Sequence, residues 1–451
     1  MKTHRNTMIV ALLVVPYACA TLWAQAAVED QAEMSGQGSS EFDAVPFVLE
    51  VVPQPGETID LMAGPPVGRV VSYDTSTSEE TIWDTDSNLE GMPQEQWIPG
   101  SGIEQAQALD DPFDLMNFSD LSWIANPEDW PRSPICKIYF SRHGTRYTGS
   151  GILIDAYHVL TAGHIVNEGN GGIWSSDLVV MPAYNGGICP YGNAKAVTFL
   201  SWEGWTLYGN LKHNIGVIRL DRPVGALTNC YGYGSTSDMS FYPEAPYNGQ
   251  YMHYWSGTFD GMDYPLLWGN RRGVGGMDGS GAYWIDSTGH RYVFAVLSYY
   301  ESDQAFFTAI TRGKFRDIQR FLDDFTPLKF DLISLAVTAS PEIIRLGDRL
   351  DSMSYIVYNH SSSSWVGTVG VDIYLSTNDY ISTSDVLLDR HYFSCNLGPK
   401  ERVTITVSNP PRIPWYILRG DHWIGVMLDV SDNDTSNNGS HGQDAAHINA
   451  L

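Results

Sequence analysis

Two short segments carry residue types suited to nucleophilic catalysis. His164 ends the run Val-Leu-Thr-Ala-Gly-His, just after an expected strand at residues 149–154. A histidine at a strand end can act as a general base near neutral pH. Ser280 lies in the glycine-rich run 275–282, where glycines allow a tight turn that exposes the hydroxyl and directs N–H groups toward one point. Each alone is equally consistent with a surface histidine or a hairpin loop, but the pair predicts a Ser-His hydrolase.

The segments around these residues have a sequence pattern that is typical of β-structure. From about residue 133, short apolar runs such as 135–140 and 151–154 alternate with Gly, Asn and Pro, which predicts a barrel or a sandwich. The region closes with a helix expected to be capped by Thr311, because its apolar residues recur at helical spacing. These are Phe315, Ile318, Phe321 and Leu322.

A second β-rich region follows Pro327. Its expected strands are residues 332–337, 354–358, 369–375, 403–407 and 423–430. Their spacing and alternation predict a separate immunoglobulin-like β-sandwich. We expect each of the two regions to fold by itself if the chain is cut near Thr326.

Together these residues resemble the trypsin-like serine peptidases, and among them the V8-like or glutamyl endopeptidase branch. The resemblance covers residues 134–324 and rests on four segments: 161–164, 182–186, 213–220 and 279–281. The chain order of base, orienting residue and nucleophile is also that of chymotrypsin. The resemblance implies an all-β, chymotrypsin-like double β-barrel with the active site in the cleft between the barrels. It further implies a triad of His164, Asn214 and Ser280 and an oxyanion hole of Asp278, Gly279 and Ser280.

Two positions of the site depart from the family. Asn214 stands where the family has an Asp that stabilises the imidazolium, and an amide there favours the wrong tautomer, at a cost of about 10⁴-fold in rate. Asp278 stands where the family has a Gly that donates an oxyanion N–H. We expect its carboxylate to point outward or to pair with Arg271 or Arg272.

The specificity pocket also departs. The histidine and the threonine with which glutamyl endopeptidases bind an acidic side chain are missing, and Gly275, Leu297 and Ser298 stand at the corresponding places. A pocket for a neutral or apolar side chain is one interpretation. A buried barrel strand is the other.

The C-terminal region resembles the CARDB domains, immunoglobulin-like modules of exported bacterial proteins associated with adhesion. The resemblance covers residues 330–438. Asn378, Asp379 and Asp385 could coordinate calcium, but turn-forming polar residues are the commoner explanation for such clusters. We therefore predict no metal and no cofactor. His158 and His164 also lack the HExxH spacing of zinc peptidases.

Charge separates the first part of the chain from the rest. The net charge is −26, which argues against a nucleic-acid partner. Residues 27–132 contain 22 Asp plus Glu against two Arg, a net charge of −20. We predict that residues 27–130 form a largely disordered leader or propeptide, which either occupies the cleft or is a solvated spacer, and that proteolysis can remove it.

The N-terminus has the pattern of a secretory signal. Basic residues precede an apolar run from Met8 to Trp23, with small residues at 24–26. The chain is therefore expected to be secreted, extracellular or periplasmic, and no later stretch is long enough to span a membrane. Cys136, Cys189, Cys230 and Cys395 then allow three disulfide connectivities or remain as thiols.

The predicted organisation has five parts: a signal peptide at 1–26, the leader at 27–130, the peptidase domain at 131–327, the CARDB-like sandwich at 328–440 and a tail at 441–451. The predicted function is an exported serine endopeptidase acting on peptide or protein substrates. The alternative is a catalytically impaired scaffold that binds an extracellular or cell-surface partner through the C-terminal domain.

Overall fold

A closed barrel forms the first half of the predicted peptidase region. Its strands lie in the order β11-β8-β7-β6-β9-β10, and β10 pairs with β11 to close the ring. Side chains such as Ile138, Phe140 and Val180 fill it and have no exposed surface. The strands are β6 (Ile135–Arg142), β7 (Thr145–Leu153), β8 (His158–Thr161), β9 (Ser176–Pro182), β10 (Ala194–Trp202) and β11 (Gly216–Leu220). The short helices are α2 (Gly163–Val166), α3 (Glu203–Thr206), η3 (Leu211–His213) and α4 (Gly225–Thr228).

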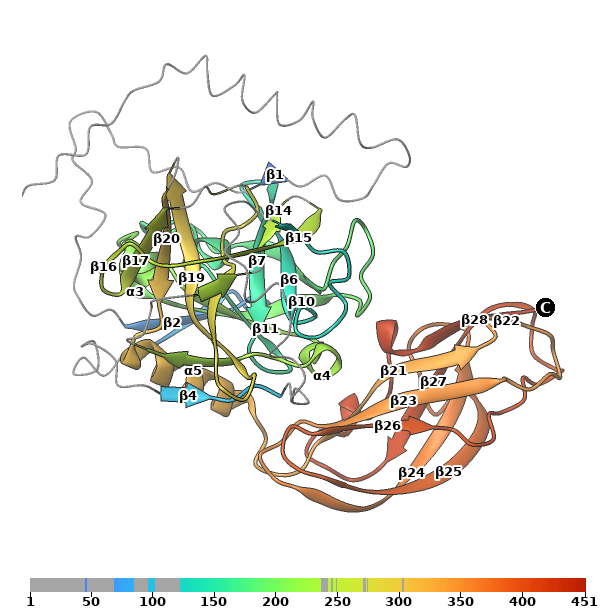
Figure 1. Ribbon diagram of the computed structural model, residues 1–451. Helices are drawn as coiled ribbons and strands as arrows, with labels where there is room; N and C mark the ends of the chain where they lie inside the picture. Colours follow the sequence, from blue (N-terminus) through green and yellow to red (C-terminus); the bar gives the residue numbers. More distant parts are fainter. Residues whose placement is uncertain are drawn as a thin grey trace, which may run out of the picture. The chain divides into compact units, whose positions relative to one another are not determined.

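These elements belong to a computed structural model of the chain, shown in Figure 1. The structure describes residues 45–46, 69–84, 96–101, 122–236, 242–244, 246–248, 250–270, 273, 275–301 and 304–451. The predicted signal peptide lies outside the described residues. No described helix combines the length and the apolar character needed to cross a membrane.

A second sheet forms the other half of the peptidase region, in the order β14-β15-β13-β18-β19-β20-β17-β16, with β12 on β19. The expected helix follows as α5 (Arg312–Phe325), where the Thr311 side chain accepts the Lys314 N–H and all four predicted apolar residues are buried. The strands are β12 (Gly232–Ser235), β13 (Tyr242–Glu244), β14 (Tyr247–Asn248), β15 (Tyr251–Gly257), β16 (Gly261–Asp263), β17 (Leu266–Asn270), β18 (Gly281–Ile285), β19 (Arg291–Glu301) and β20 (Gln304–Ala309).

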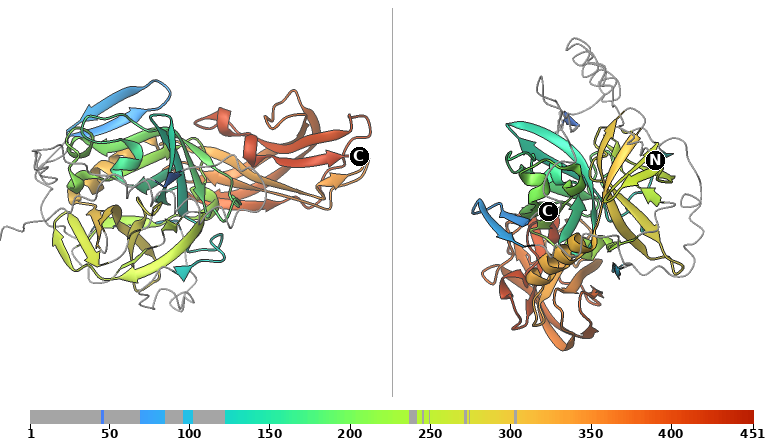
Figure 2. Two further views of the ribbon diagram at one scale, coloured as in Figure 1. Left: turned by 90° about the horizontal axis from the view of Figure 1, so that it is seen from above. Right: turned by 90° about the vertical axis from the view of Figure 1, so that its left-hand side faces the viewer.

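The described parts of the acidic segment form strands, which differs from the disorder expected there. β2 (Val70–Asp74) pairs with β10 and with β3 (Glu79–Trp83), and Figure 2 shows this hairpin in blue beside the first barrel. β4 (Gln96–Ile98) pairs with β12, β5 (Ser122–Trp123) with β15, and β1 (Val45–Pro46) with β7. Two contacts hold this hairpin: Val70 enters the core, and the Arg69 guanidinium binds the Glu203 carboxylate at 2.5 Å. The acidic composition of the segment as a whole predicted disorder, although the segment contains these short apolar stretches.

The C-terminal region is a sandwich of two sheets. One has the order β21-β23-β26 and the other β22-β28-β27-β24-β25. The predicted all-β architecture of a double barrel followed by a sandwich is therefore confirmed. The strands are β21 (Leu332–Ser340), β22 (Ile343–Ile344), β23 (Ser352–Asn359), β24 (Trp365–Ser376), β25 (Val386–Leu397), β26 (Arg402–Thr406), β27 (Gly420–Asp429) and β28 (Ala446–Ala450), with short helices η4 (Thr435–Asn437) and η5 (Gly442–Asp444).

The end of the chain belongs to this sandwich rather than to a tail. β28 lies between β27 and β22, and Ala446, Ile448 and Ala450 alternate into the core. Residues 44–451 form one unit, in which Tyr157 packs with Leu335 and Tyr358, and Arg222 binds Asp444 at 2.7 Å. The sandwich thus shares a buried apolar cluster with the first barrel.

The β2–β3 hairpin allows a matched test of whether this segment stabilises the fold. Val70 is fully buried, whereas Ile82, in the paired strand, is exposed. We expect Val70→Ala to lower the free energy of unfolding by about 1–3 kcal/mol and Ile82→Ala to change it by less than about 0.5 kcal/mol. Chemical denaturation of the two variants measures both values. Equal small effects would mean that the hairpin carries no stability.

Candidate active site

His164 lies in the one-turn helix α2, directly after strand β8. Its side chain has no exposed surface, and the Trp205 ring packs against it edge-on at 6.2 Å. Gly163 allows this close packing, since a Cβ there would come within 3.0 Å of the Asn214 Oδ1 atom and of the Ile215 N atom. The sequence thus places the imidazole at the point where β8 meets the segment before β11.

The side-chain amide of Asn214 forms hydrogen bonds with three groups. Its Oδ1 atom accepts the backbone N–H of His164 (2.8 Å), and its Nδ2 atom lies 3.0 Å from both His164 Nδ1 and the Ser298 carbonyl oxygen. Rotating the amide by 180° would set Nδ2 against an N–H and Oδ1 against a carbonyl. The neighbours therefore fix its orientation.

This orientation selects a tautomer of His164. An NH₂ group can only donate, so Nδ1 must be the accepting nitrogen and the imidazole proton must be on Nε2. A base for Ser280 needs the opposite tautomer, with a lone pair on Nε2. The geometry therefore disfavours proton transfer from the serine to His164 in this state.

The charge around His164 acts in the same direction. Burial, and next the positive charge of Arg142, lower the pKa of His164 to about 3. Arg142 is itself buried, and its Nη2 atom donates to the His164 carbonyl oxygen at 2.6 Å. Sequence reasoning missed Arg142, because nothing in residues 141–146 marks it as a neighbour of the histidine.

The serine lies in a loop that only glycine permits. Gly279 has φ +85°, and a Cβ there would come within 2.2 Å of Thr161 Oγ1 and 2.7 Å of Ile165 Cδ1. Those two residues flank His164 closely, so the loop packs against the segment that carries the base. The Ser280 carbonyl oxygen also accepts the Leu297 N–H at 2.8 Å, one residue before the carbonyl that binds Asn214.

Glu244 contacts the predicted nucleophile. It is fully buried on β13, opposite Ala282, and its Oε1 atom accepts the hydrogen bond of the Ser280 hydroxyl. The serine proton thus points to a carboxylate rather than to His164. Sequence reasoning missed Glu244, since its surroundings contain no motif and the contact arises only from sheet register.

Two of the three predicted oxyanion amides are already engaged. The Ser280 N–H donates to the Met277 carbonyl (3.0 Å), and the Gly279 N–H donates to the Leu297 carbonyl (2.8 Å). The expected outward position of Asp278 is wrong, because its side chain is 1% exposed. A hydrogen bond joins the loop of Asp278 to strand β7, because the Asp278 carbonyl accepts the Ser150 N–H at 2.8 Å. Arg271 and Arg272 lie outside the described residues.

The three residues proposed for a specificity pocket do not lie together on an open surface. Leu297 has no exposed area and packs with Phe294 and Phe307 in the apolar core of the second sheet. Ser298 is also fully buried, and its Oγ atom accepts from Thr308 Oγ1 at 3.0 Å. Gly275 is half-buried. The alternative interpretation of β19, a buried barrel strand, fits these two residues.

The remaining candidate ligands take structural positions. Asn378 Oδ1 accepts the Tyr380 N–H, and Asp385 accepts the Ser382 N–H, as turn-forming residues do. Among the described residues, no three His, Cys, Asp or Glu side chains group as metal ligands. All four cysteines outside the signal region are thiols.

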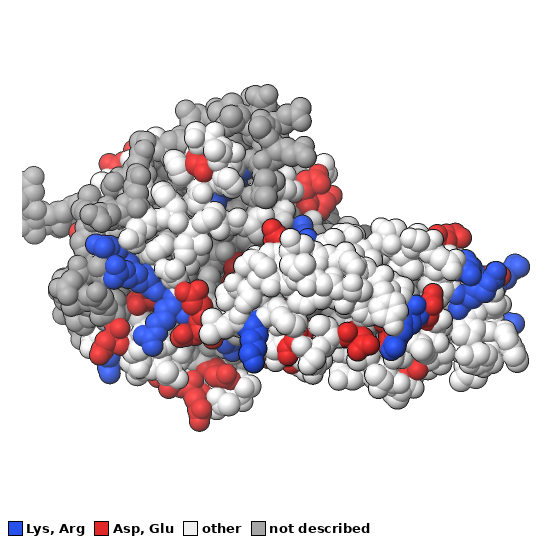
Figure 3. Space-filling model, turned by 90° about the horizontal axis from the view of Figure 1, so that it is seen from below, with Lys and Arg blue, Asp and Glu red and all other residues white. Residues whose placement is uncertain are grey.

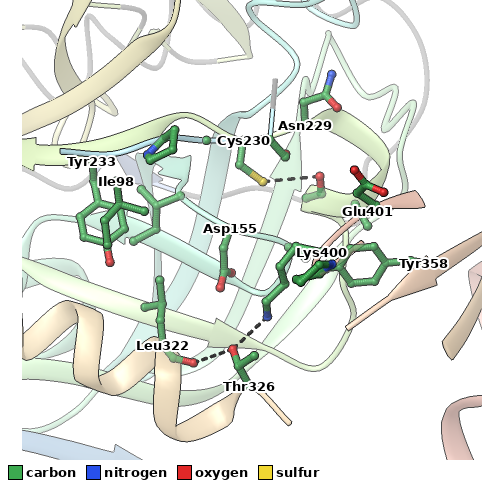
Figure 4. A pocket seen from close by; sticks show the side chains of 18 of the residues that line it. Ile98, Asp155, Asn229, Cys230, Tyr233, Leu322, Thr326, Tyr358, Lys400 and Glu401 are labelled. Carbon is green, nitrogen blue, oxygen red and sulfur yellow. Dashed lines mark hydrogen bonds between the residues drawn. The ribbon is translucent and has the colours of Figure 1, made fainter. Parts of the chain in front are cut away.

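A separate cavity of about 720 Å³ lies where the first barrel, α5 and residues 399–402 meet. Figure 4 shows Asp155 and Lys400 in it, with Lys400 Nζ donating to Thr326 Oγ1 at 2.9 Å. His164, Asn214 and Ser280 are not among the residues that line it. The cavity therefore belongs to the contact with the sandwich and not to the predicted catalytic residues.

The fold and the predicted residues define an all-β peptidase-like molecule, and known proteins resemble it over part of its length. The chain is 32% identical over 103 residues to an extracellular metalloprotease of Bacillus subtilis, covering 23% of this chain and 33% of that protein. It is 31% identical over 102 residues to a glutamyl endopeptidase of Bacillus licheniformis, covering 21% and 32%. The chain thus spans about a third of these curated relatives. No family model matches it.

Solved structures align with parts of the chain at lower identity. A Glu endopeptidase aligns with 19% identity and a TM-score of 0.41, covering 45% of this chain and 97% of that one. A CARDB domain from Pyrococcus furiosus aligns with 18% identity and a TM-score of 0.20, covering 29% and 96%. The predicted resemblance to glutamyl endopeptidases is therefore present in the sequence comparison, and a CARDB domain is among the structural neighbours.

The tautomer of His164 can be measured directly. We expect long-range ¹⁵N–¹H spectra of the natural chain to show the proton on Nε2 and no protonation of this ring between pH 8 and about pH 4, since its pKa is lowered to about 3. In Asn214→Asp the proton should move to Nδ1. His164→Gln assigns the signal. A proton on Nδ1 in the natural chain would contradict the arrangement.

Proposed function

We propose that this chain is an exported serine endopeptidase whose site rests in a slowly reacting state. The observation that carries the proposal is the bridge made by Asn214. One amide joins His164 to β19 next to the residue that binds the Ser280 carbonyl. The predicted base and nucleophile thus come from both halves of the double barrel, as an acyl-transfer site requires.

The proposed reaction uses this chain's own groups. Once Asn214 has released His164 Nδ1 and the ring proton has moved from Nε2 to Nδ1, the Ser280 Oγ atom attacks the peptide carbonyl carbon, the serine proton passes to His164 Nε2, and the carbonyl oxygen becomes an oxyanion. The same proton then goes to the leaving amine as the C–N bond breaks, which leaves an acyl ester on Ser280. Water hydrolyses the ester and restores the hydroxyl. The N–H of Ser280 would bind the oxyanion after releasing the Met277 carbonyl.

Three contacts make the first step slow in the resting arrangement. Asn214 directs its NH₂ group to His164 Nδ1, Arg142 adds a positive charge next to the ring, and the serine proton points to Glu244. Each disfavours the ion pair of imidazolium and alkoxide that normally develops during attack. Peptide hydrolysis is therefore expected to be well below that of a relative with an Asp at this place.

A second function is favoured by one observation. His164 and Ser280 both have no exposed surface, so no peptide reaches them without a local opening. A scaffold of this kind could bind an extracellular partner without turnover. The experiment below separates the two functions, because only the first requires a reactive serine.

Restoring an acidic residue should raise reactivity. We expect Asn214→Asp to increase kcat up to about 10⁴-fold, with little change in KM, because the residue contacts the base and not the substrate. A serine-reactive phosphonate measures acyl-enzyme formation in the natural chain, in Asn214→Asp, and in Asn214→Asp combined with Ser280→Ala. Slow labelling, fast labelling and no labelling, in that order, would support the proposal.

The other outcomes are equally informative. No labelling of the natural chain together with labelling of Asn214→Asp would indicate the non-catalytic scaffold. Because Asp would bring a carboxylate oxygen toward the Ser298 carbonyl, thermal unfolding must be recorded for every variant. If the folded Asn214→Asp chain labels no faster than the natural chain, Asn214 does not limit the base.

Glu244 provides a second test of the same site. We expect Glu244→Gln, made in the Asn214→Asp background, to accelerate labelling about tenfold, because the hydroxyl loses its charged acceptor and the oxyanion forms farther from a negative charge. Glutamine keeps the size of the side chain and so limits the loss of packing. A decrease in rate would mean that Glu244 itself takes the serine proton, and the assignment of His164 as base would then be wrong.

A further inference from the structure

One loop of the sandwich exposes three large apolar side chains. Trp415, Tyr416 and Leu418 lie between β26 and β27 and are 78%, 64% and 80% exposed. The two aromatic rings contact each other edge-on at 5.8 Å. Grouped apolar exposure of this kind marks an interaction site more often than isolated exposed residues do.

The exposure does not result from a poorly anchored loop. Ile413 is fully buried in the sandwich core, its N–H donates to the Asp348 carbonyl, and its carbonyl accepts the Gly347 N–H, both at 2.8 Å. At the other end, His422 Nε2 donates to the Leu418 carbonyl at 2.8 Å. The loop base is fixed on both sides, so the apolar side chains are held in solvent.

Four exposed arginines accompany these side chains. Arg412 and Arg419 bound the loop, and Arg345 and Arg349 lie in the neighbouring turn, which a β-bridge between Arg349 and Arg412 joins to it. We call residues 345–349 and 412–419 the aromatic-arginine tip. It contains four Arg and one acidic residue, Asp348, in a chain of net charge −26. Figure 3 shows Lys and Arg gathered at one end of the sandwich.

The positive charge of the tip is not neutralised internally. Arg349 Nη1 donates to Asn409 Oδ1 and the Pro410 carbonyl, both at 2.6 Å, and Arg412 Nη1 donates to the Gly347 carbonyl at 3.0 Å. These acceptors are uncharged. Within the part of the chain that the structure describes, none of the four guanidinium groups forms an ion pair with a carboxylate.

Two acidic side chains that flank the tip in the chain, Asp421 and Glu342, have a different partner, whereas Asp351 is exposed two residues beyond Arg349. His447 Nε2 lies 3.2 Å from Asp421 Oδ1, and His447 Nδ1 lies 3.3 Å from Glu342 Oε1. Both carboxylates therefore lie beside β28 and contact an imidazole instead of an arginine. Residues 345–349 and 412–419 thus contain four Arg and one Asp together with three exposed apolar side chains.

We propose that the aromatic-arginine tip binds anionic phospholipid bilayers. Tyr and Trp rings favour the headgroup region, Leu favours the acyl boundary just below it, and guanidinium groups bind phosphates at the same level. A protein partner is the poorer match, since a stable interface buries about 800 Å² per partner, whereas the apolar part of the tip is two aromatic side chains of roughly 150–250 Å² each and one Leu. The inference does not depend on the peptidase site.

Vesicle co-sedimentation of the full chain tests the proposal. We expect binding to phosphatidylcholine vesicles that contain phosphatidylglycerol and little binding to phosphatidylcholine alone. Arg412→Gln with Arg419→Gln should lower the partition coefficient roughly 30-fold at low salt, as two surface arginines contribute about one factor of five each, and added salt should reduce this difference. Trp415→Ala with Leu418→Ala should lower it at least about tenfold.

Ile188→Ser is the matched control, because Ile188 is a large exposed apolar residue of the peptidase region. It should leave binding unchanged, and since all substituted side chains are exposed, the unfolding temperatures should agree. Equal binding to neutral and anionic vesicles would overturn the proposal. So would an equal loss in Ile188→Ser, or a self-association in sedimentation velocity that the tip variants abolish while vesicle binding persists.

Discussion

The amide of Asn214 is the contact on which the arrangement of the site depends. It spans the two halves of the double barrel, because it binds the backbone and the ring of His164 on one side and the Ser298 carbonyl of β19 on the other. A carboxylate could satisfy the first two partners but not the third, since two oxygens would then face each other. An amide is thus the better structural choice here, and the acid-base function of the histidine is reduced by the same geometry.

The charged side chains next to His164 and Ser280 are placed differently from those of a conventional triad. The usual carboxylate stabilises the imidazolium from the Nδ1 side, whereas here a carboxylate contacts the nucleophile and a guanidinium lies near the imidazole. With both groups buried, the interactions are stronger than they would be in water. The acidic side chain thus lies at the nucleophile and the basic side chain at the histidine, which is the reverse of the usual arrangement.

The sequence predicted what depends on local pattern. The barrels, the sandwich and the capped helix α5 follow from alternation, helical spacing and Thr311, and these features are present in the structure. The contact between Asn214 and His164 could be expected from the resemblance to known peptidases. Glu244 and Arg142 could not, because sheet register alone brings them to Ser280 and His164. The strands of the acidic segment escaped prediction as well, since each is short and all except β3, which pairs with β2, pair with residues more than a hundred positions away.

The pairing of β2 with β10 has a consequence for any maturation of the chain. Along β10, β9 pairs with residues 194–195 and β2 continues on that side from Thr198 to Trp202. The hairpin therefore covers a sheet edge that would otherwise present unpaired N–H and C=O groups to other chains. A protease that cuts after Ile98 leaves this edge protected only if the severed hairpin stays attached through its own contacts. After such a cleavage, the solubility of the protein would therefore depend on whether the β2–β3 hairpin stays paired with β10, and not on the negative charge of the acidic segment alone.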